Sequence, residues 1–177
     1  LVIGSEQIST RLDMEDRNTC VLFGDGAGAT VIELKEGTEL YSVWGSEGLS
    51  DVLGCTGQNM GKAHIFMDGQ KTFKNAVKRM GSAAAEVLEQ SGYTMDDIDY
   101  VVCHQANERI IDAVVKRMDI PEEKVVKVIA RYGNTSAASI PITLDDMYEQ
   151  GMLEKGNRIL LATFGAGFTW ASMIVEI

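Results

Sequence analysis

The order of apolar segments along the chain predicts an α/β fold, with helices packed on a sheet. Short apolar runs of strand length alternate with longer segments in which apolar residues recur every three or four positions. Such alternation is typical of strands joined by helices, so the sheet is expected to be mainly parallel. The chain has 177 residues, of which 45% are hydrophobic, and this is enough to bury one core of ordinary size.

The first third of the chain is expected to contribute strands and one irregular segment. Apolar runs predict strands at residues 1–3, 19–23, 29–34 and 40–44. The glycine-rich sequence GDGAG at 24–28 lacks the spacing of a phosphate-binding loop, so a tight turn is the favoured interpretation. The stretch at 45–61 is rich in Gly, Ser and Asn and has no period, and we expect it to be irregular.

Three helices are expected in the rest of the chain. The strongest prediction covers residues 70–91, where apolar side chains recur at steps of three and four. A second helix is expected at 110–118. A third is expected at 136–152, with Pro141 in its first turns, where a missing N–H costs least. Strands are expected between and after these helices, at residues 99–103, 125–130, 158–164 and 169–177.

Charge and hydropathy exclude two classes of protein. The chain has 16 Lys and Arg residues against 26 Asp and Glu residues, a formal net charge of −10. We therefore expect no binding to nucleic acid, because that binding depends on counterion release at basic surfaces. No apolar run approaches the roughly 20 residues that a membrane-spanning helix needs, so no membrane association is expected either.

The cysteines and the start of the chain indicate its cellular context. Cys20, Cys55 and Cys103 show neither CxxC spacing nor a Cys/His metal pattern, so we expect reduced thiols, no metal site and a cytoplasmic location. No secretory signal is recognisable. Residues 1–4 (LVIG) have the character of a strand interior without an initiator Met, and we expect the chain to begin within a larger protein.

Polar side chains follow two predicted strands, at positions where ligands bind in α/β sheets. His104 follows the strand expected at 99–103, and Asn134 follows the strand expected at 125–130. An imidazole N–H and a carboxamide –NH₂ directed at one point can stabilise an oxyanion. On spacing alone, a packed histidine and a helix-capping asparagine stay open as the alternative.

The residues offer no clear nucleophile to accompany this pair. Cys103 precedes His104, and adjacent strand residues point to opposite faces, so Cys103 is expected to be a core thiol. Cys20 falls in an apolar run and has the same interpretation, whereas Cys55 in the irregular segment stays open. A GxSxG sequence is absent, which argues against an α/β-hydrolase.

Two of the predicted helices carry basic residues on an otherwise acidic protein. These are Lys71, Lys74 and Lys78 on the first helix and Arg109, Lys116 and Arg117 on the second. A local basic surface can bind a phosphate group or an acidic protein. Exposed helix faces are also often basic without any binding function, so both interpretations stay open.

Several segments together resemble β-ketoacyl-acyl-carrier-protein synthase III. They are DRNTCVLFGDGAGA at residues 16–29, HQANERII at 104–111, YGNTSAASIP at 132–141 and FGAGFTW at 164–170. The resemblance covers essentially the whole chain, in the family's order. It implies an α/β, thiolase-like fold and a homodimer. Residues 1–34 then end the amino-terminal half, and residues 35–177 form the carboxyl-terminal half, with helices packed on a mixed five-stranded sheet.

The resemblance also implies a reaction. The family starts fatty-acid synthesis by condensing an acyl-CoA primer with malonyl-acyl-carrier protein, using a Cys–His–Asn triad and no cofactor beyond the coenzyme A thioester substrate. His104 and Asn134 match the His and Asn of the triad. The family's cysteine lies in an amino-terminal segment that has no match here, so the isolated chain is expected to be inactive without that segment.

Two alternatives to this enzyme stay open. One is another condensing enzyme of the superfamily, of the polyketide-starter or 3-hydroxy-3-methylglutaryl-CoA synthase type. The other is a non-catalytic chain that binds a carrier protein or completes a dimer.

Binding residues are carried over from the same resemblance. Coenzyme A and the substrate are expected to contact Arg17, Met67, Gly69, Phe73, Asn107, Arg109 and Phe164. Arg17 lies beside the adenine in this assignment, and Phe164 packs beside the catalytic pair. The acidic carrier protein is expected to dock on Lys74, Arg109, Lys116 and Arg117.

Overall fold

A four-stranded mixed sheet lies at the centre of the computed structural model, which describes residues 1–33, 36–37, 39–56 and 64–177. Its strands are, in order, β3 (Tyr41–Ser46), β8 (Thr169–Glu176), β7 (Arg158–Gly165) and β6 (Tyr100–Cys103). β6 and β7 are parallel, whereas β7 with β8 and β8 with β3 are antiparallel. The prediction of a mainly parallel sheet is therefore wrong, because only a short turn joins β7 to β8.

The mixed sheet that the resemblance implies is confirmed, but the sheet has four strands, and in place of the expected fifth strand there is a single β-bridge. Val101 of β6 pairs with Val125 in parallel orientation, and the chain then leaves the sheet. The strand expected at 125–130 is thus wrong beyond Val125, because the chain turns into the short helix α3 (Ile129–Tyr132).

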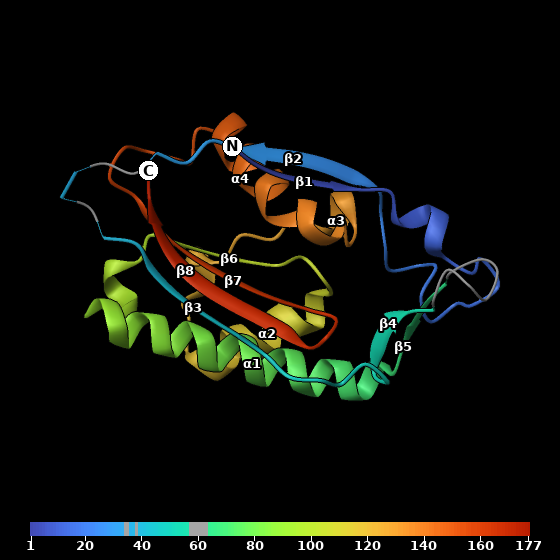
Figure 1. Ribbon diagram of the computed structural model, residues 1–177. Coiled ribbons are helices and arrows are strands. Elements are labelled where there is room, and N and C mark those ends of the chain that lie inside the picture. The colour runs from blue at the N-terminus through green and yellow to red at the C-terminus, as the bar shows by residue number, and fades with distance from the viewer. Residues whose placement is uncertain (34–35, 38, 57–63) are drawn as a thin grey trace.

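Helices cover both faces of the sheet (Figure 1). The long helix α1 (Gly69–Ser91) and α2 (Glu108–Met118) lie on one face. α1 begins where the Asp68 side chain accepts a hydrogen bond from the Lys71 backbone N–H and ends at Gly92, whose φ is +73°. α3 and α4 (Ser139–Glu149) lie on the other face, and α4 begins three residues later than predicted because η5 (Ser136–Ala138) is a 3₁₀ turn.

A two-stranded antiparallel ribbon packs on α4 and η5, on the side away from the sheet (Figure 1). It consists of β1 (Val2–Glu6) and β2 (Gly26–Thr30), so the turn expected at residues 24–28 is largely a strand. Its glycines allow the ribbon to lie close to the backbone of η5 and α4. A Cβ on Gly4 would lie 2.5 Å from the carbonyl oxygen of Ala137, and one on Gly28 would lie 3.0 Å from the backbone nitrogen of Ile142.

The strand expected at residues 19–23 is not formed. The backbone curls into turns there, with hydrogen bonds from Cys20 N to Asp16 O (3.0 Å) and from Leu22 N to Thr19 O (3.0 Å). The Asp16 carboxylate stabilises the first turn by accepting from Asn18 N (3.0 Å). Local side-chain hydrogen bonds thus outweigh the apolar pattern, and only Phe23 forms a bridge, to Asn134.

The segment expected to be irregular contributes one strand to a further two-stranded sheet. β4 (Leu53–Cys55) pairs with β5 (Ile65–Met67) in antiparallel orientation, and residues 57–61 of the expected segment lie outside the described residues. The remaining short elements are η1 (Ile8–Arg11), η3 (Met95–Asp97) and η4 (Glu122–Lys124). Within the part of the chain that the structure describes, no helix has both the length and the apolar character needed to cross a membrane.

Candidate active site

His104 lies at the end of β6, where the chain leaves the sheet toward α2. Its backbone N–H continues the parallel ladder by donating to Ala162 O (2.8 Å), and the residue is 8% exposed. The ring Nδ1 lies 2.6 Å from Ser139 Oγ, and the ring meets Phe164 edge to face with centroids 6.0 Å apart. Burial lowers the pKa of His104 from 6.5 to about 4, so the imidazole is neutral near pH 7.

Asn134 follows α3, and both its backbone N–H and its backbone carbonyl are hydrogen-bonded to the segment around Phe23. Its N–H donates to Leu22 O (3.0 Å), and its carbonyl accepts from Gly24 N (2.9 Å). The side-chain Oδ1 accepts from Ser136 N (2.9 Å). Because the oxygen is engaged there, the amide nitrogen is the end that can donate to a ligand.

The buried side chain of Gln105 holds the loops that carry His104 and Asn134 together. Its Nε2 donates to Cys103 O (2.8 Å) and Val126 O (3.3 Å). Its Oε1 accepts from Val128 N (3.0 Å) and Ile129 N (3.2 Å). The amide thus uses both donors and both acceptor positions at 1% exposure, and it ties the end of β6 to the segment that leads into α3.

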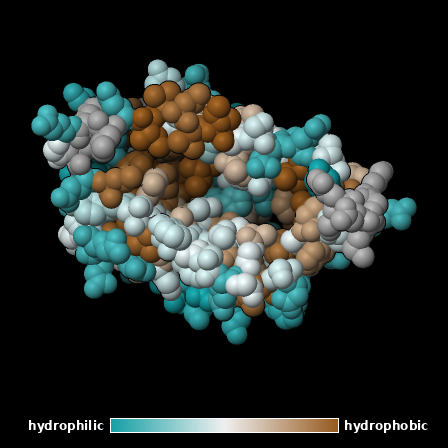
Figure 2. Space-filling view, in the orientation of Figure 1, coloured by the Kyte–Doolittle hydropathy of each residue, from teal (hydrophilic) through white to brown (hydrophobic). Residues whose placement is uncertain are grey.

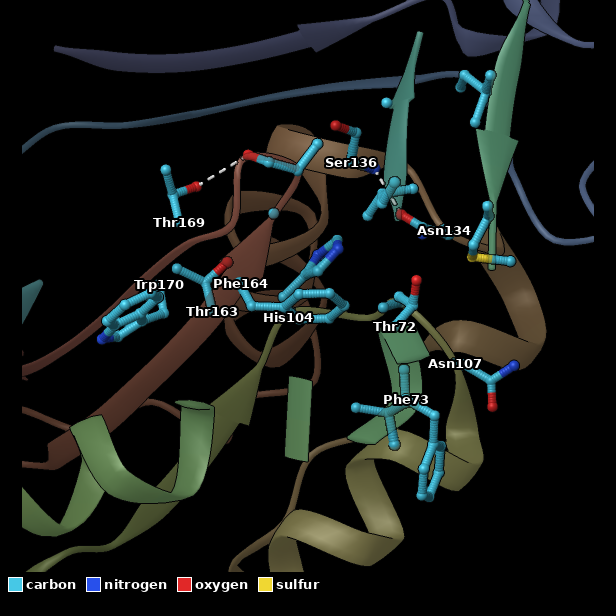
Figure 3. Close-up of a pocket in the computed structure, with 18 of the residues that line it drawn as sticks. Thr72, Phe73, His104, Asn107, Asn134, Ser136, Thr163, Phe164, Thr169 and Trp170 are labelled. Atoms are coloured by element: carbon cyan, nitrogen blue, oxygen red, sulfur yellow. Dashed lines mark hydrogen bonds between the residues drawn. The ribbon is translucent and has the colours of Figure 1, made fainter. Parts of the chain in front are cut away.

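One cavity of about 1500 Å³ connects most of the residues expected to bind substrate. In Figure 3 the side chains of His104, Asn134 and Phe164 point toward the same space. Its lining includes the residues proposed from the sequence as ligands of coenzyme A, namely Met67, Gly69, Phe73, Asn107 and Arg109. Arg17 is not brought into this cavity: its side chain is exposed in the turns that precede Phe23.

The cysteines differ in their surroundings. Cys103 is fully buried, and burial raises the pKa of its thiol to about 12, so the thiol stays protonated and inert near neutral pH. Cys20 is half-buried in the turns, outside any strand. Cys55 is exposed and lines the cavity. Within the described ranges, no group of three or more His, Cys, Asp or Glu side chains is arranged to hold a metal ion.

The four basic residues expected to dock a carrier protein are all exposed. Lys74 lies on α1, and Arg109, Lys116 and Arg117 lie on α2, which packs against α1. Arg109 is also at the cavity. Arg117 extends along Gly81 of α1, where an added Cβ would lie 2.9 Å from Arg117 Cδ.

A mixed sheet with helix pairs on both faces, and a His and an Asn at one cavity, place the chain in the class of α/β domains with a thiolase-like fold. Residues 88–177 match the family description 3-Oxoacyl-[acyl-carrier-protein (ACP)] synthase III C terminal, and residues 1–48 match 3-Oxoacyl-[acyl-carrier-protein (ACP)] synthase III. The chain belongs to the β-ketoacyl-acyl-carrier-protein synthase III family.

Similar proteins extend over the whole chain. It is 46% identical over 192 residues to β-ketoacyl-[acyl-carrier-protein] synthase III of Caldanaerobacter subterraneus, which matches 99% of this chain and 57% of the relative. A structure of 3-oxoacyl-[acyl-carrier-protein] synthase III from Aquifex aeolicus superposes with a TM-score of 0.91 at 42% identity, over 99% of this chain and 56% of that one.

A second similar structure is that of an enzyme from a polyketide pathway. The priming β-ketosynthase of the R1128 polyketide biosynthetic pathway superposes with a TM-score of 0.93 at 33% identity, over 99% of this chain and 56% of that one. The chain therefore spans somewhat more than half the length of the relatives that it matches.

Proposed function

We propose that this chain is the carboxyl-terminal part of a condensing enzyme that joins an acyl-CoA primer to malonyl-acyl-carrier protein, with loss of CO₂, to give a β-ketoacyl-acyl-carrier protein. The observation that carries the proposal is that His104 and Asn134 meet at one cavity, with the Asn oxygen held by the backbone and the His ring neutral. We further propose that the complete protein is a homodimer and that residues 1–34 end its amino-terminal half.

The proposed role of the pair is to stabilise charge during decarboxylation. When malonyl-thioester loses CO₂, the electron pair of the broken C–C bond passes to the α-carbon, and negative charge builds on the thioester oxygen. His104 and Asn134 donate hydrogen bonds to that oxygen, each contributing about 3–4 kcal/mol to lowering the barrier. A pKa of about 4 makes His104 a donor that stays uncharged while it binds the oxyanion. The enolate carbon then attacks the acyl thioester, a C–C bond forms and the thiolate leaves.

We infer that the nucleophilic thiolate that carries the acyl group comes from sequence outside these 177 residues. Cys103 is inert, and Cys20 is not part of the cavity lining. Cys55 lines the cavity and is the one candidate to be tested. If Cys55 were the nucleophile, Cys55→Ala would abolish acyl-enzyme formation and Cys20→Ala would not; retained acylation in Cys55→Ala excludes it.

The surface of the ribbon supports a further covering segment in the complete protein. Figure 2 shows apolar side chains gathered over β1 and β2. In and next to these strands, Leu1, Ile3, Val31 and Ile32 are between 56% and 80% exposed. Apolar surface of this kind is typical of an interface, and we propose that the segment with the catalytic cysteine packs there.

We propose coenzyme A binding in the cavity and carrier-protein docking outside it. Met67, Gly69 and Phe73 form the wall nearest the start of α1, which suits the apolar length of pantetheine. Arg17 is proposed to meet the adenine in the complete protein. The exposed cations of α1 and α2 suit an acidic carrier protein, because charge complementarity speeds and orients docking.

The test is product analysis with the complete protein, acyl-CoA and malonyl-acyl-carrier protein. We expect equal amounts of CO₂ and a β-ketoacyl group on the carrier protein, detected by intact mass. Carrier protein that keeps its malonyl group would contradict the proposal. Priming of polyketide synthesis is the second candidate function, and the similarity to the R1128 structure favours it. The two candidate functions are distinguished by measuring which lengths of acyl-CoA primer the complete protein prefers.

An intact-mass spectrum under denaturing conditions tests where the cysteine comes from. A second species of roughly 130–140 residues, about the remainder of a fold of two similar halves, would be the segment to test for acylation. A single 19.3 kDa species would confine the condensing activity to a longer parent protein.

A further inference from the structure

Ser139 lies against His104 at the start of α4 and is almost fully buried. It is the first residue of the helix and is 2% exposed. Its Oγ lies 2.6 Å from His104 Nδ1 and 3.4 Å from the backbone nitrogen of Gln105. The hydroxyl therefore stands between the ring of His104 and the backbone of the next residue.

The number of protons at this contact decides which group donates. The Gln105 N–H can only donate, so Ser139 Oγ accepts from it. If Nδ1 of His104 also carried a proton and donated to Oγ, the serine hydrogen would need a third partner. Among the described residues, the hydroxyl makes no other hydrogen bond. A buried hydroxyl hydrogen without an acceptor is costly, so donation from Ser139 to Nδ1 is favoured.

We propose that Ser139 is a positioning residue: its hydroxyl donates to Nδ1 of His104 and thereby keeps the imidazole proton on Nε2. The ring is neutral near pH 7 because it is buried, so it carries one proton in total. The partner of one ring nitrogen then determines which atom the other presents. With Ser139 in place, the nitrogen remote from α4 presents an N–H; in the other tautomer it presents a lone pair.

The consequence for catalysis rests on the proposed function. An enolate oxygen requires a donor, and a lone pair in the same place repels it. Loss of the Ser139 hydroxyl is therefore expected to lower kcat for malonyl decarboxylation by about tenfold to a hundredfold, with little change in KM, because the ground-state thioester carries no negative charge.

The direct test is ¹⁵N NMR of the protein labelled at histidine, at neutral pH. The chain has two histidines, so His64 serves as an internal control for the ring signals of His104. His64 lies far along the chain from Ser139 and contacts Asp13 instead, with 3.8 Å between Nδ1 and Oδ2. We expect His104 in the wild type to show a protonated Nε2 and an unprotonated, hydrogen-bonded Nδ1, with about a tenfold preference for that tautomer.

Three variants separate the hydrogen bond from the stability of the helix. Ser139→Ala is expected to shift the Nδ1 signal and to reduce the preference for Nε2–H, and Ser139→Thr, which keeps the hydroxyl, is expected to restore both. Thr143→Val is the matched control, because Thr143 is buried one turn further along α4 and its hydroxyl donates to the Ser139 carbonyl (2.7 Å), whereas the ring of His104 is bonded to Ser139 Oγ. Its His104 signals should equal those of the wild type.

Two results overturn the inference. One is a wild-type His104 with its proton on Nδ1, which needs no variant to be seen. The other is a Ser139→Ala spectrum with both ring signals unchanged; Ser139→Cys, with a weaker donor of similar size, gives the same comparison if the alanine variant does not fold. The Nε2–H tautomer without malonyl decarboxylation would contradict the proposed function alone, and the Nδ1–H tautomer with decarboxylation would contradict this inference alone.

Discussion

Gln105→Leu removes a buried amide that joins the two halves of the candidate site. Leucine has a similar size and no polar atoms, so the volume is kept while four hydrogen bonds are lost. These bonds, of 2.8, 3.3, 3.0 and 3.2 Å, lead to two carbonyls and two backbone N–H groups that then lie unpaired inside the protein. At about 1 kcal/mol each, their loss lowers the free energy of unfolding by about 4 kcal/mol, a large part of the roughly 5–15 kcal/mol of an ordinary domain.

The assay is denaturant unfolding followed by circular dichroism, with Gln150→Leu as the matched control. Gln150 is the exposed residue that directly follows α4, and its side chain donates one hydrogen bond, to Asp146. The same substitution there is expected to change the free energy of unfolding by at most about 0.5 kcal/mol. If Gln105→Leu costs no more than Gln150→Leu, the reasoning that Gln105 holds the two loops together is refuted.

Three further predictions address the pH dependence, the ribbon and the basic surface. The pKa of His104 is about 4 in the folded protein and 6.5 in the unfolded chain, so the unfolded chain binds the proton first as the pH falls. The free energy of unfolding should therefore drop by about 3 kcal/mol between pH 6.5 and 4. An NMR titration midpoint for His104 near 6.5 would contradict this. Gly4→Ala should lower the free energy of unfolding by about 2 kcal/mol or more, because the added Cβ would overlap the backbone of η5. Gly48→Ala is the control: no atom lies within 4 Å of the added Cβ, so this substitution should have little effect in the same assay. In the complete protein, Arg109→Glu should weaken carrier-protein binding more than binding of free coenzyme A, measured by calorimetry against the exposed control Lys155→Glu; a reversed order would refute the docking proposal.

Periodicity predicted the helices and the long strands but failed where side chains compete with the backbone. α1 and α2 agree with the predicted stripes to within two residues at each end. The run at 19–23 is apolar enough for a strand, yet hydrogen bonds to Asp16 curl it into turns. The run at 125–130 loses its strand character for a related reason, because Gln105 binds the backbone of Val128 and Ile129 from outside the segment. A contact with a residue this distant in the sequence cannot be predicted from the residues of the segment itself.

The sequence suggested one shared location for the candidate pair, because His104 follows a buried strand and Asn134 follows an apolar run, although that run is a strand only at Val125 and continues as α3. His104 and Asn134 do lie at one cavity, as their positions in the sequence suggested. The residues that position them were missed, since Gln105 and Ser139 look like ordinary polar residues of a loop and a helix start. A polar side chain between a buried strand and a helix, as at Gln105, was the one available hint. Arg17 is the opposite case: it was expected to contact coenzyme A, but its side chain is exposed and is not among the residues that line the cavity.

The central claim is that His104 and Asn134 stabilise the enolate formed from the malonyl-thioester. The most direct measurement compares two half-reactions in the complete protein: release of CO₂ from malonyl-thioester and transfer of the acyl group from acyl-CoA. His104→Ala and Asn134→Ala should each slow CO₂ release by about 100-fold to 1000-fold and leave acyl transfer largely intact. Equal loss of both half-reactions in both variants would contradict the account.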